Sequence, residues 1–380
     1  MSLKELVINN LNERRDRILR GDINCIPSPF QRFSDDLIGI EQSTYYTITS
    51  FTKGSKSQFT SYYFIFKPLL YIYYNKPNIK LTIFYFPLEE TQERITQRFI
   101  SFLLYEFTNG DIRISPRDLR STTKALDSEV LSIINLPEIQ DILDFFEKNI
   151  IFSTESNPTG IYKFCKSYAE NNGKTFTKTI HIKDEFGIPQ EREIFDYYIP
   201  NDPNEYKLII IDTINLIDGE KGLNVKQSID KLSEYLAKHL RNRYGFSPVV
   251  IQQQAFDSEG IENIKLNKVR PSVAGLGDSK YTSRDSNIVL GLFSPMRFEL
   301  KEYLGYDITQ FKDAIRFLEV IVNRDGEMGG IIALYFDGAV SAYRELPLPN
   351  DSTGLNKVYN FMYHNRLKNR KADYSKYLNK

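Results

Sequence analysis

The feature that most constrains the fold is an alternation of strand-like and helix-like stretches that begins at Tyr45. Short apolar runs, rich in β-branched and aromatic residues, alternate with longer stretches in which apolar residues recur at helical spacing. Strands are predicted at 45–49, 80–86, 149–152, 207–211, 249–252 and 287–293, and helices from about 57, at 90–105 and at 224–243. This alternation is typical of α/β proteins. We therefore expect a mostly parallel central β-sheet flanked by helices.

Local signals refine these elements. Ser115, before Pro116, and Asn224 have the side chains that accept hydrogen bonds at helix starts, so we predict that they cap helices. Pro68 should kink or end the first helix, because proline has no backbone N–H. Three closing strands are predicted at 318–323, 330–336 and 340–344, the last two joined by a turn at Asp337-Gly338.

Three segments stand apart from this core of residues 26–350. Residues 1–25 hold an amphipathic helix that ends at Gly21, either a frayed terminal helix or a linker helix that docks on a neighbouring subunit. Residues 174–200 alternate around Phe186-Gly187 and predict an inserted β-hairpin. Residues 351–380 form a basic tail, either a solvated helix or an auxiliary contact for DNA or a partner.

Composition narrows the functional classes. The 49 basic and 49 acidic residues balance, so any contact with nucleic acid must come from local basic loops. Two isolated cysteines and three histidines do not have zinc-ligand spacing. A polar N-terminus and the absence of a long apolar run predict a cytoplasmic protein without a membrane segment.

The segment after the first predicted strand has the character of a phosphate-binding loop. A Walker A loop needs G-x-x-x-x-G-K-[ST] between a strand and a helix. Lys56 and Ser57 match the lysine and hydroxyl, but Ser50 and Ser55 occupy both glycine positions. We take the nucleotide-binding residues to be Ser50, Thr52, Lys53, Gly54, Ser55, Lys56 and Ser57. The alternative is an ordinary polar helix start.

Carboxylates follow two of the buried strands. Asp212 ends the strand at 207–211, where an open α/β sheet places its ligands, and with Ser57 it would hold Mg²⁺. Glu89 and Glu90 follow the strand at 80–86, where Glu89 would activate water and Glu90 would favour the next helix start. The alternatives are a turn-capping aspartate and two first-turn acids.

A run of three glutamines, Gln252 to Gln254, ends the strand at 249–252. A glutamine at a strand tip can hydrogen-bond the terminal phosphate and report its loss to an adjacent loop. We choose Gln254 for this role, although the register among the three stays open. The alternative is a solvated strand end.

The order of these segments resembles the DnaB-like family of RecA-type ATPases, from about Ile26 to Leu346. Ile26–Phe30 and Gly39–Glu41 are similar to the family's lead-in to the phosphate loop, Leu88-Glu89 to its catalytic glutamate and Ile211-Asp212 to its Walker B strand end. The resemblance implies a RecA-like P-loop core that uses ATP and Mg²⁺.

The most specific similarity is the stretch Arg270–Ser279, followed by Asp285-Ser286-Asn287. In the family this loop lines a ring channel and touches the DNA backbone. The resemblance implies that DNA is contacted by Gly277, Asp278, Ser279 and Lys280, with Lys265, Lys268 and Arg284 nearby. Cations and backbone N–H groups at phosphates suit tracking without base readout. The alternative is a solvated, charged loop.

Asn323 to Gly329 resembles the family's arginine-finger turn, in which Arg324 would reach the neighbouring subunit's phosphate. A hairpin-turn arginine is the alternative. Three departures are the Walker A serines, Val322 in place of a family lysine, and the lack of room for an N-terminal helical domain, which suits phage or mobile-element modules.

Together the resemblance implies an ATP-driven helicase on single-stranded DNA that is expected to form a hexameric ring, with a primase or loader as partner. Two other interpretations are a filament-forming recombinase or annealing ATPase, and a catalytically silent loader or scaffold.

Overall fold

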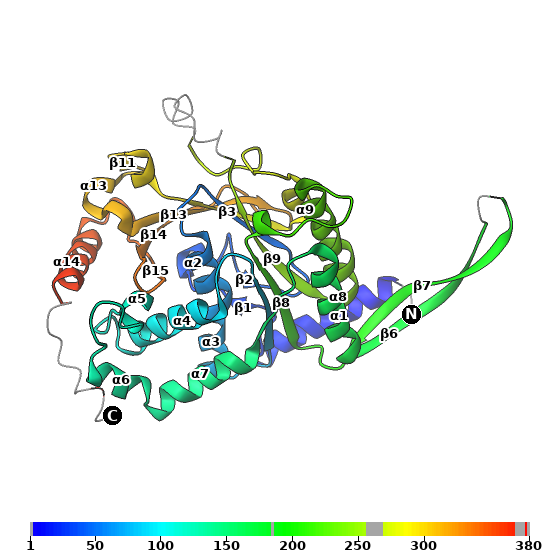
Figure 1. The fold of residues 1–380 in the computed structure, drawn as a ribbon, viewed down its shortest axis with the longest axis horizontal. Helices are drawn as coiled ribbons and strands as arrows, with labels where there is room; N and C mark the ends of the chain where they lie inside the picture. The colour runs from blue at the N-terminus through cyan, green and yellow to red at the C-terminus, as the bar shows by residue number, and fades with distance from the viewer. Residues whose placement is uncertain (1–2, 184–185, 256–268, 369–376, 378–380) are drawn as a thin grey trace.

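A nine-stranded sheet forms the centre of the computed structural model, which describes residues 3–183, 186–255, 269–368 and 377 (Figure 1). In spatial order its strands are β15 (Ala342–Glu345), β14 (Ile331–Asp337), β13 (Ile315–Asn323), β10 (Ile288–Phe293), β3 (Tyr46–Ser50), β9 (Phe246–Gln253), β8 (Glu205–Asp212), β4 (Lys80–Pro87) and β5 (Ile150–Phe152). From β10 to β5 all neighbours are parallel, whereas β13, β14 and β15 run antiparallel. The predicted mostly parallel sheet is confirmed.

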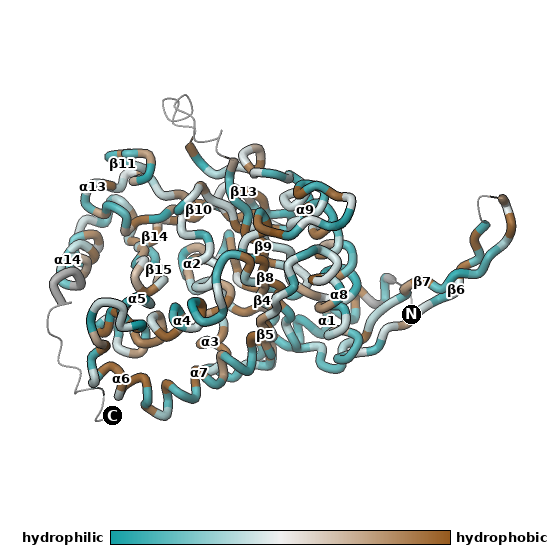
Figure 2. Tube along the Cα trace, viewed as in Figure 1, coloured by the Kyte–Doolittle hydropathy of each residue, from teal (hydrophilic) through white to brown (hydrophobic). Residues whose placement is uncertain are grey.

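Period-two alternation buries both faces of this sheet. On β8, Leu208 and Ile210 belong to one apolar cluster, whereas Ile209 and Ile211 belong to the other. One face is covered by α2 (Lys56–Thr60), α3 (Lys67–Asn75), α4 (Gln92–Phe107) and α7 (Pro137–Asn149), the other by α8 (Pro158–Asn171) and α9 (Val225–Glu234). Apolar residues accordingly gather along the strands, and polar residues on the outer sides of the helices (Figure 2).

The predicted helix starts are confirmed where side-chain caps were expected. Ser115 caps α5 (Pro116–Leu119) and Asn224 caps α9, and each forms a reciprocal capping box with the residue three positions on. The remaining short elements are α6 (Ser128–Ile134), α10 (Asn242–Tyr244), α12 (Tyr281–Asp285), α13 (Ile308–Phe311), β1 (Ile26–Pro27), β2 (Gly39–Ile40), β11 (Glu302–Tyr303) and β12 (Tyr306–Asp307).

Pro68 does not end the helix that follows the phosphate loop, so that part of the prediction is wrong. The chain passes from α2 through a π-helical turn, Ser61–Phe66, directly into α3. A proline ring clashes with the carbonyl four residues earlier in a regular α-helix. The wider π turn changes the hydrogen-bonding pattern there, and the helix continues to Asn75.

Two elements extend from the same side of the body (Figure 1). The predicted hairpin is present as β6 (Gly173–Lys183) and β7 (Pro189–Pro200). The N-terminal helix α1 (Leu3–Leu19) keeps its apolar residues exposed, Leu11 at 62% and Ile18 at 56%. Apolar side chains left this open on a helix are typical of a segment that packs against another molecule.

The C-terminal helix α14 (Ser352–Lys368) corrects the expectation of a solvated tail. Leu355 and Met362 are buried in the apolar cluster over β13 and β14, and the ring of Phe361 lies edge-on to Tyr335 at 5.9 Å. The basic residues of this segment had outweighed its apolar spacing in the sequence. Among the described residues, no helix is long and apolar enough to cross a membrane.

Candidate functional site

The phosphate-type loop lies between β3 and α2, at the edge of the sheet where the parallel strands end. Lys56, the first residue of α2, turns back over the loop, and its Nζ donates to the carbonyl oxygens of Ser50 and Phe51, both at 3.4 Å. The ammonium group therefore sits above the loop, in the position from which it would meet a phosphate.

Serine at position 50 is accommodated because residue 54 is glycine. The Ser50 Oγ donates to the Phe51 carbonyl at 2.8 Å and fills the interior of the loop. A Cβ on Gly54 would lie 2.3 Å from that Oγ and 2.9 Å from the Phe51 carbonyl oxygen. Gly54 thus provides the space that the consensus glycine provides at position 50.

Ser55 adopts the left-handed conformation that glycine ordinarily provides, with φ of 70°. Its hydroxyl accepts a hydrogen bond from Arg316 Nε at 2.9 Å, and its carbonyl accepts one from the Tyr343 hydroxyl at 3.2 Å. Arg316 is almost fully buried on β13 and also contacts the Asp313 carboxylate at 2.9 Å. Side-chain bonds therefore hold the loop where the family uses a flexible glycine. Sequence reasoning missed Arg316, although a charge inside an apolar strand was a signal.

Ser57 and Asp212, predicted as partners at a metal, lie together. The Ser57 hydroxyl donates to Asp212 Oδ1 at 2.8 Å, and the Tyr85 hydroxyl donates to Oδ2 at 2.8 Å. Burial raises the pKa of the Asp212 carboxyl to about 6, although both hydrogen bonds oppose the rise. Two hard oxygen donors beside a loop lysine fit the ligand preference of Mg²⁺ in nucleotide sites.

Replacing Asp212 by asparagine is expected to stabilise the nucleotide-free protein at neutral pH. A pKa raised from 3.8 to about 6 means that this group stabilises the fold below pH 4, and that the contribution is lost as the pH rises through 6. The loss is at most about 3 kcal/mol. In Asp212→Asn, thermal unfolding should therefore move up by a few degrees at pH 7.5 but not at pH 4. A lower unfolding temperature than wild type at pH 7.5 would contradict this.

Glu89 is held next to the metal-site strand by its backbone. The N–H groups of Leu88 and Glu89 both donate to the Asp212 carbonyl, at 2.9 and 3.1 Å, and the Glu89 side chain is exposed. Glu90 is not a first-turn acid as predicted: α4 begins at Gln92 with Thr91 as its cap, and Glu90 forms an ion pair with Arg98.

The three glutamines divide between two loops, because successive strand residues face opposite sides. Gln253 Nε2 donates to the Thr52 hydroxyl of the phosphate loop. Gln252 Nε2 donates to the Ser279 carbonyl at 2.7 Å, and Gln254 Nε2 donates to the Thr49 hydroxyl at 2.9 Å and the Ser272 carbonyl at 3.0 Å. Gln254, our first choice as phosphate sensor, is buried and committed to these partners, whereas Gln253 faces the phosphate loop.

The predicted DNA-contacting loop packs on the same strand end. The Gly277 N–H donates to the Gln253 carbonyl at 3.0 Å, and Asp278 accepts from Asn215, which follows the metal-site strand. Ser279 is buried and donates to Asp230, so its hydroxyl is turned away from solvent.

Exposed cations of this loop lie on and next to α12: Lys280 and Arg284, the latter stacked on Tyr281 at 3.8 Å. Lys265 and Lys268 lie outside the described residues.

No protein-family model and no curated protein matches the chain. Solved structures do match. The ATPase domain of a DnaB-like replicative helicase has a TM-score of 0.64 at 14% identity, with 91% of this chain and 99% of that chain covered. A longer DnaB-like replicative helicase, described with its interactions with primase, has a TM-score of 0.60 at 14% identity, covering 91% of this chain and 67% of that one. The RadB recombinase matches at a TM-score of 0.44 and 11% identity, covering 85% and 100%.

The chain has the RecA-type fold of DnaB-like helicases. Within this DnaB-like fold, Arg324 lies at the sheet edge opposite to the phosphate loop. Asn323 pairs with Ile288, which pairs with Tyr46 at the start of β3, four residues before Ser50. Four strand residues span about 13 Å, so Arg324 lies far from its own loop. Its exposed side chain contacts the Arg284 carbonyl.

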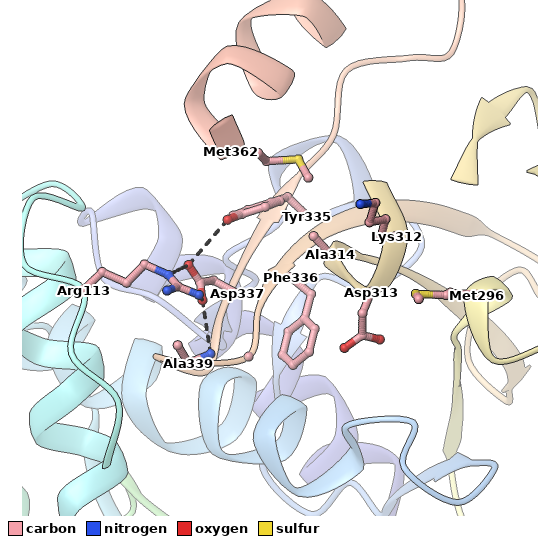
Figure 3. Close-up of a pocket in the computed structure, with 11 residues that line it drawn as sticks. Arg113, Met296, Lys312, Asp313, Ala314, Tyr335, Phe336, Asp337, Ala339 and Met362 are labelled. Carbon is pink, nitrogen blue, oxygen red and sulfur yellow. Dashed lines mark hydrogen bonds and ion pairs between the residues drawn. The ribbon is translucent and has the colours of Figure 1, made fainter. Parts of the chain in front are cut away.

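A cavity of about 460 Å³ adjoins the phosphate loop of this DnaB-like core (Figure 3). Gln58 on α2 donates to the Gly338 carbonyl at its rim, at 2.9 Å. Arg113 binds the Asp337 carboxylate through two nitrogens, at 2.6 and 2.8 Å. The walls are Met296, Lys312, Asp313, Ala314, Tyr335, Phe336, Ala339 and Met362. An apolar floor with a polar rim is the environment in which proteins bind ring-shaped ligands.

Proposed function

We propose that this protein is an ATP-driven motor of the DnaB-like type, which moves along single-stranded DNA during replication as a ring of copies, six by analogy. One observation supports this most: Lys56, Ser57, Glu89 and Asp212 converge at one sheet edge, whereas Arg324 lies at the opposite edge, facing outward. A site arranged in this way is complete only when a second copy contributes its arginine.

In this proposal each side chain has one task. Lys56 and the loop amides bind the phosphates, and Ser57 and Asp212 would hold Mg²⁺, which would neutralise phosphate charge. Glu89 accepts the proton of the attacking water, and its exposed carboxylate beside Asp212 suits that role. The cavity at Gly338 would take the nucleoside.

Coupling to DNA passes through the glutamine strand end. Gln253 senses the terminal phosphate through the Thr52 side of the loop, while Gln252 and Gln254 carry the displacement of β9 to the DNA-contacting loop. Lys280 and Arg284 then bind backbone phosphates without reading bases. Helix α1 would dock on the adjacent copy, and a primase or loader is the expected further partner.

Lys56→Ala tests the proposed site directly. Loss of the ammonium removes the positive charge over the loop, so DNA-stimulated ATP hydrolysis should fall at least about 10²-fold. Phosphate release is measured with and without a single-stranded oligonucleotide. The matched control is Lys163→Ala, an exposed lysine on α8, which should retain full activity. Unchanged hydrolysis in Lys56→Ala would remove the proposed site.

Two observations separate the remaining alternatives. The left-handed Ser55 and its bond to Arg316 favour a rigid loop, which would also suit a silent scaffold that binds ATP without turnover. Wild-type protein that binds a labelled ATP analogue but never hydrolyses ATP would favour the scaffold. Electron microscopy with single-stranded DNA distinguishes closed rings from the filaments of a recombinase.

A further inference from the structure

The β6–β7 hairpin is anchored firmly at its base. The Tyr198 hydroxyl donates to the carbonyls of Ala169 and Asn172, at 2.9 and 3.2 Å, and its ring lies edge-on to Tyr244 at 5.2 Å. Lys207 Nζ lies 5.1 Å from the Tyr198 ring and donates to the Tyr244 carbonyl at 2.8 Å. Beyond this base the strands extend away from the body (Figure 1). The contacts fix the direction of the arm.

Strand register sorts the side chains of the arm onto two different faces. Directly opposed residues of an antiparallel pair point to the same side. One face therefore combines cations with aromatic and aliphatic groups, in the pairs Lys174↔Ile199, Phe176↔Tyr197, Lys178↔Ile194, Ile180↔Arg192 and Ile182↔Gln190. The other face carries the acids, in the pairs Thr179↔Glu193 and His181↔Glu191. We call the first the cationic face.

The charges on the cationic face remain accessible. Lys174 and Arg192 are exposed, and Lys178 is 56% exposed although it pairs with Asp196 at 2.9 Å. Among the described hairpin residues, Asp196 is the one acid that forms an ion pair with these three cations. Tyr197, stacked on Phe176 at 4.5 Å, is 48% exposed. Cations interleaved with aromatic side chains are the combination that binds nucleic acid backbones and bases.

The tip of the arm is apolar. Phe186 is 80% exposed and Ile188 58%, and Pro189 follows as the first residue of β7. Asp184 and Glu185 lie outside the described residues. Apolar tips of this kind enter between base steps in proteins that bind DNA with extended arms, and a two-stranded ribbon fits the major groove of a duplex.

We propose that the cationic face of the β6–β7 hairpin binds DNA as a second contact, separate from the DNA-contacting loop at Gly277–Arg284. This goes beyond the proposed motor function, because it places a DNA-binding arm on the N-terminal edge of the sheet, where β8 begins. The ligand is a DNA strand recognised by its phosphates and by apolar contact with bases, whether in a duplex or unpaired.

The test compares binding to a fluorescent duplex, a forked DNA and an oligo(dT) strand, measured by anisotropy over a series of salt concentrations and without ATP. The variant Lys174→Gln/Lys178→Gln/Arg192→Gln should bind at least one of these probes about tenfold more weakly. Its salt dependence should be shallower, by up to about 2.7 for duplex or 2.1 for a single strand, at roughly 0.9 and 0.7 per lost phosphate contact. The probe that responds identifies the form of DNA.

The matched control is Glu191→Gln/Glu193→Gln on the opposite face, which should leave the salt slope unchanged. Thermal unfolding of all variants shows that the body is intact. Wild-type affinity and slope in the triple variant for all three probes would overturn the proposal. So would a change in subunit association, measured by mass photometry, without a change in DNA affinity, because the face would then bind another copy of the chain. No ATP turnover is needed, so the arm and the motor can fail independently.

Discussion

Arg324→Ala is expected to lower ATP turnover of the assembled protein by about 10³-fold or more, while nucleotide binding stays close to wild type. The reason is geometric. Arg324 lies at the sheet edge opposite to its own phosphate loop, so the terminal phosphate that it stabilises must belong to another copy. The loop residues of each subunit keep their own contacts with the nucleotide, and only the transition-state charge loses its partner.

Mixing experiments make this prediction sharp. Arg324→Ala and Lys56→Ala subunits are each expected to be inactive alone. In a mixed assembly, a Lys56→Ala subunit supplies its arginine to the intact loop of an Arg324→Ala subunit, and part of the activity should return. Arg94→Ala, an exposed arginine on α4, serves as the control and should be fully active. Two inactive partners that remain inactive in every mixture would argue against a shared site.

Glu89→Gln should lower the turnover number by about 10²–10⁴-fold, because an amide cannot accept the proton of the attacking water. Nucleotide affinity should be retained, since the exposed side chain of Glu89 lies beside the Asp212 carbonyl and not in the phosphate loop. Turnover is measured under saturating ATP, and affinity with a fluorescent nucleotide analogue.

Two neighbouring acids control for this result. Glu93→Gln, in the first turn of α4, should have no effect on turnover. Glu90→Gln breaks the ion pair with Arg98, so it should lower stability more than activity. If Glu90→Gln abolished hydrolysis and Glu89→Gln did not, the assignment of the two carboxylates would have to be exchanged.

Those parts of the fold that depend on local sequence could be predicted. The run Leu208–Ile211 is apolar at every position, which specifies a strand buried on both faces, and the Asn224 cap is set by residues three positions apart. Ser57 and Asp212 were predicted to meet because parallel strands bring their ends to one edge. Each of these inferences needed only one element and its neighbours.

What the sequence did not reveal depends on contacts between distant residues. Arg316 and Ser55 are 261 positions apart, and their bond follows from the antiparallel return of β13 to the loop edge. The facing of Gln253 and Gln254 depends on the strand register, which a run of identical residues conceals. Likewise, α14 packs on β13 and β14 through two apolar residues in a segment that is otherwise basic.

The exchange between Ser50 and Gly54 bears on how such chains are found. A pattern that demands glycine at the first and sixth loop positions rejects this sequence, although the loop keeps one residue without a Cβ at the place where space requires it. A criterion based on available volume, which accepts a hydroxyl at one position when its neighbour across the loop has no side chain, would retain it. Diverged ATPases are better sought by such compensated pairs than by invariant letters.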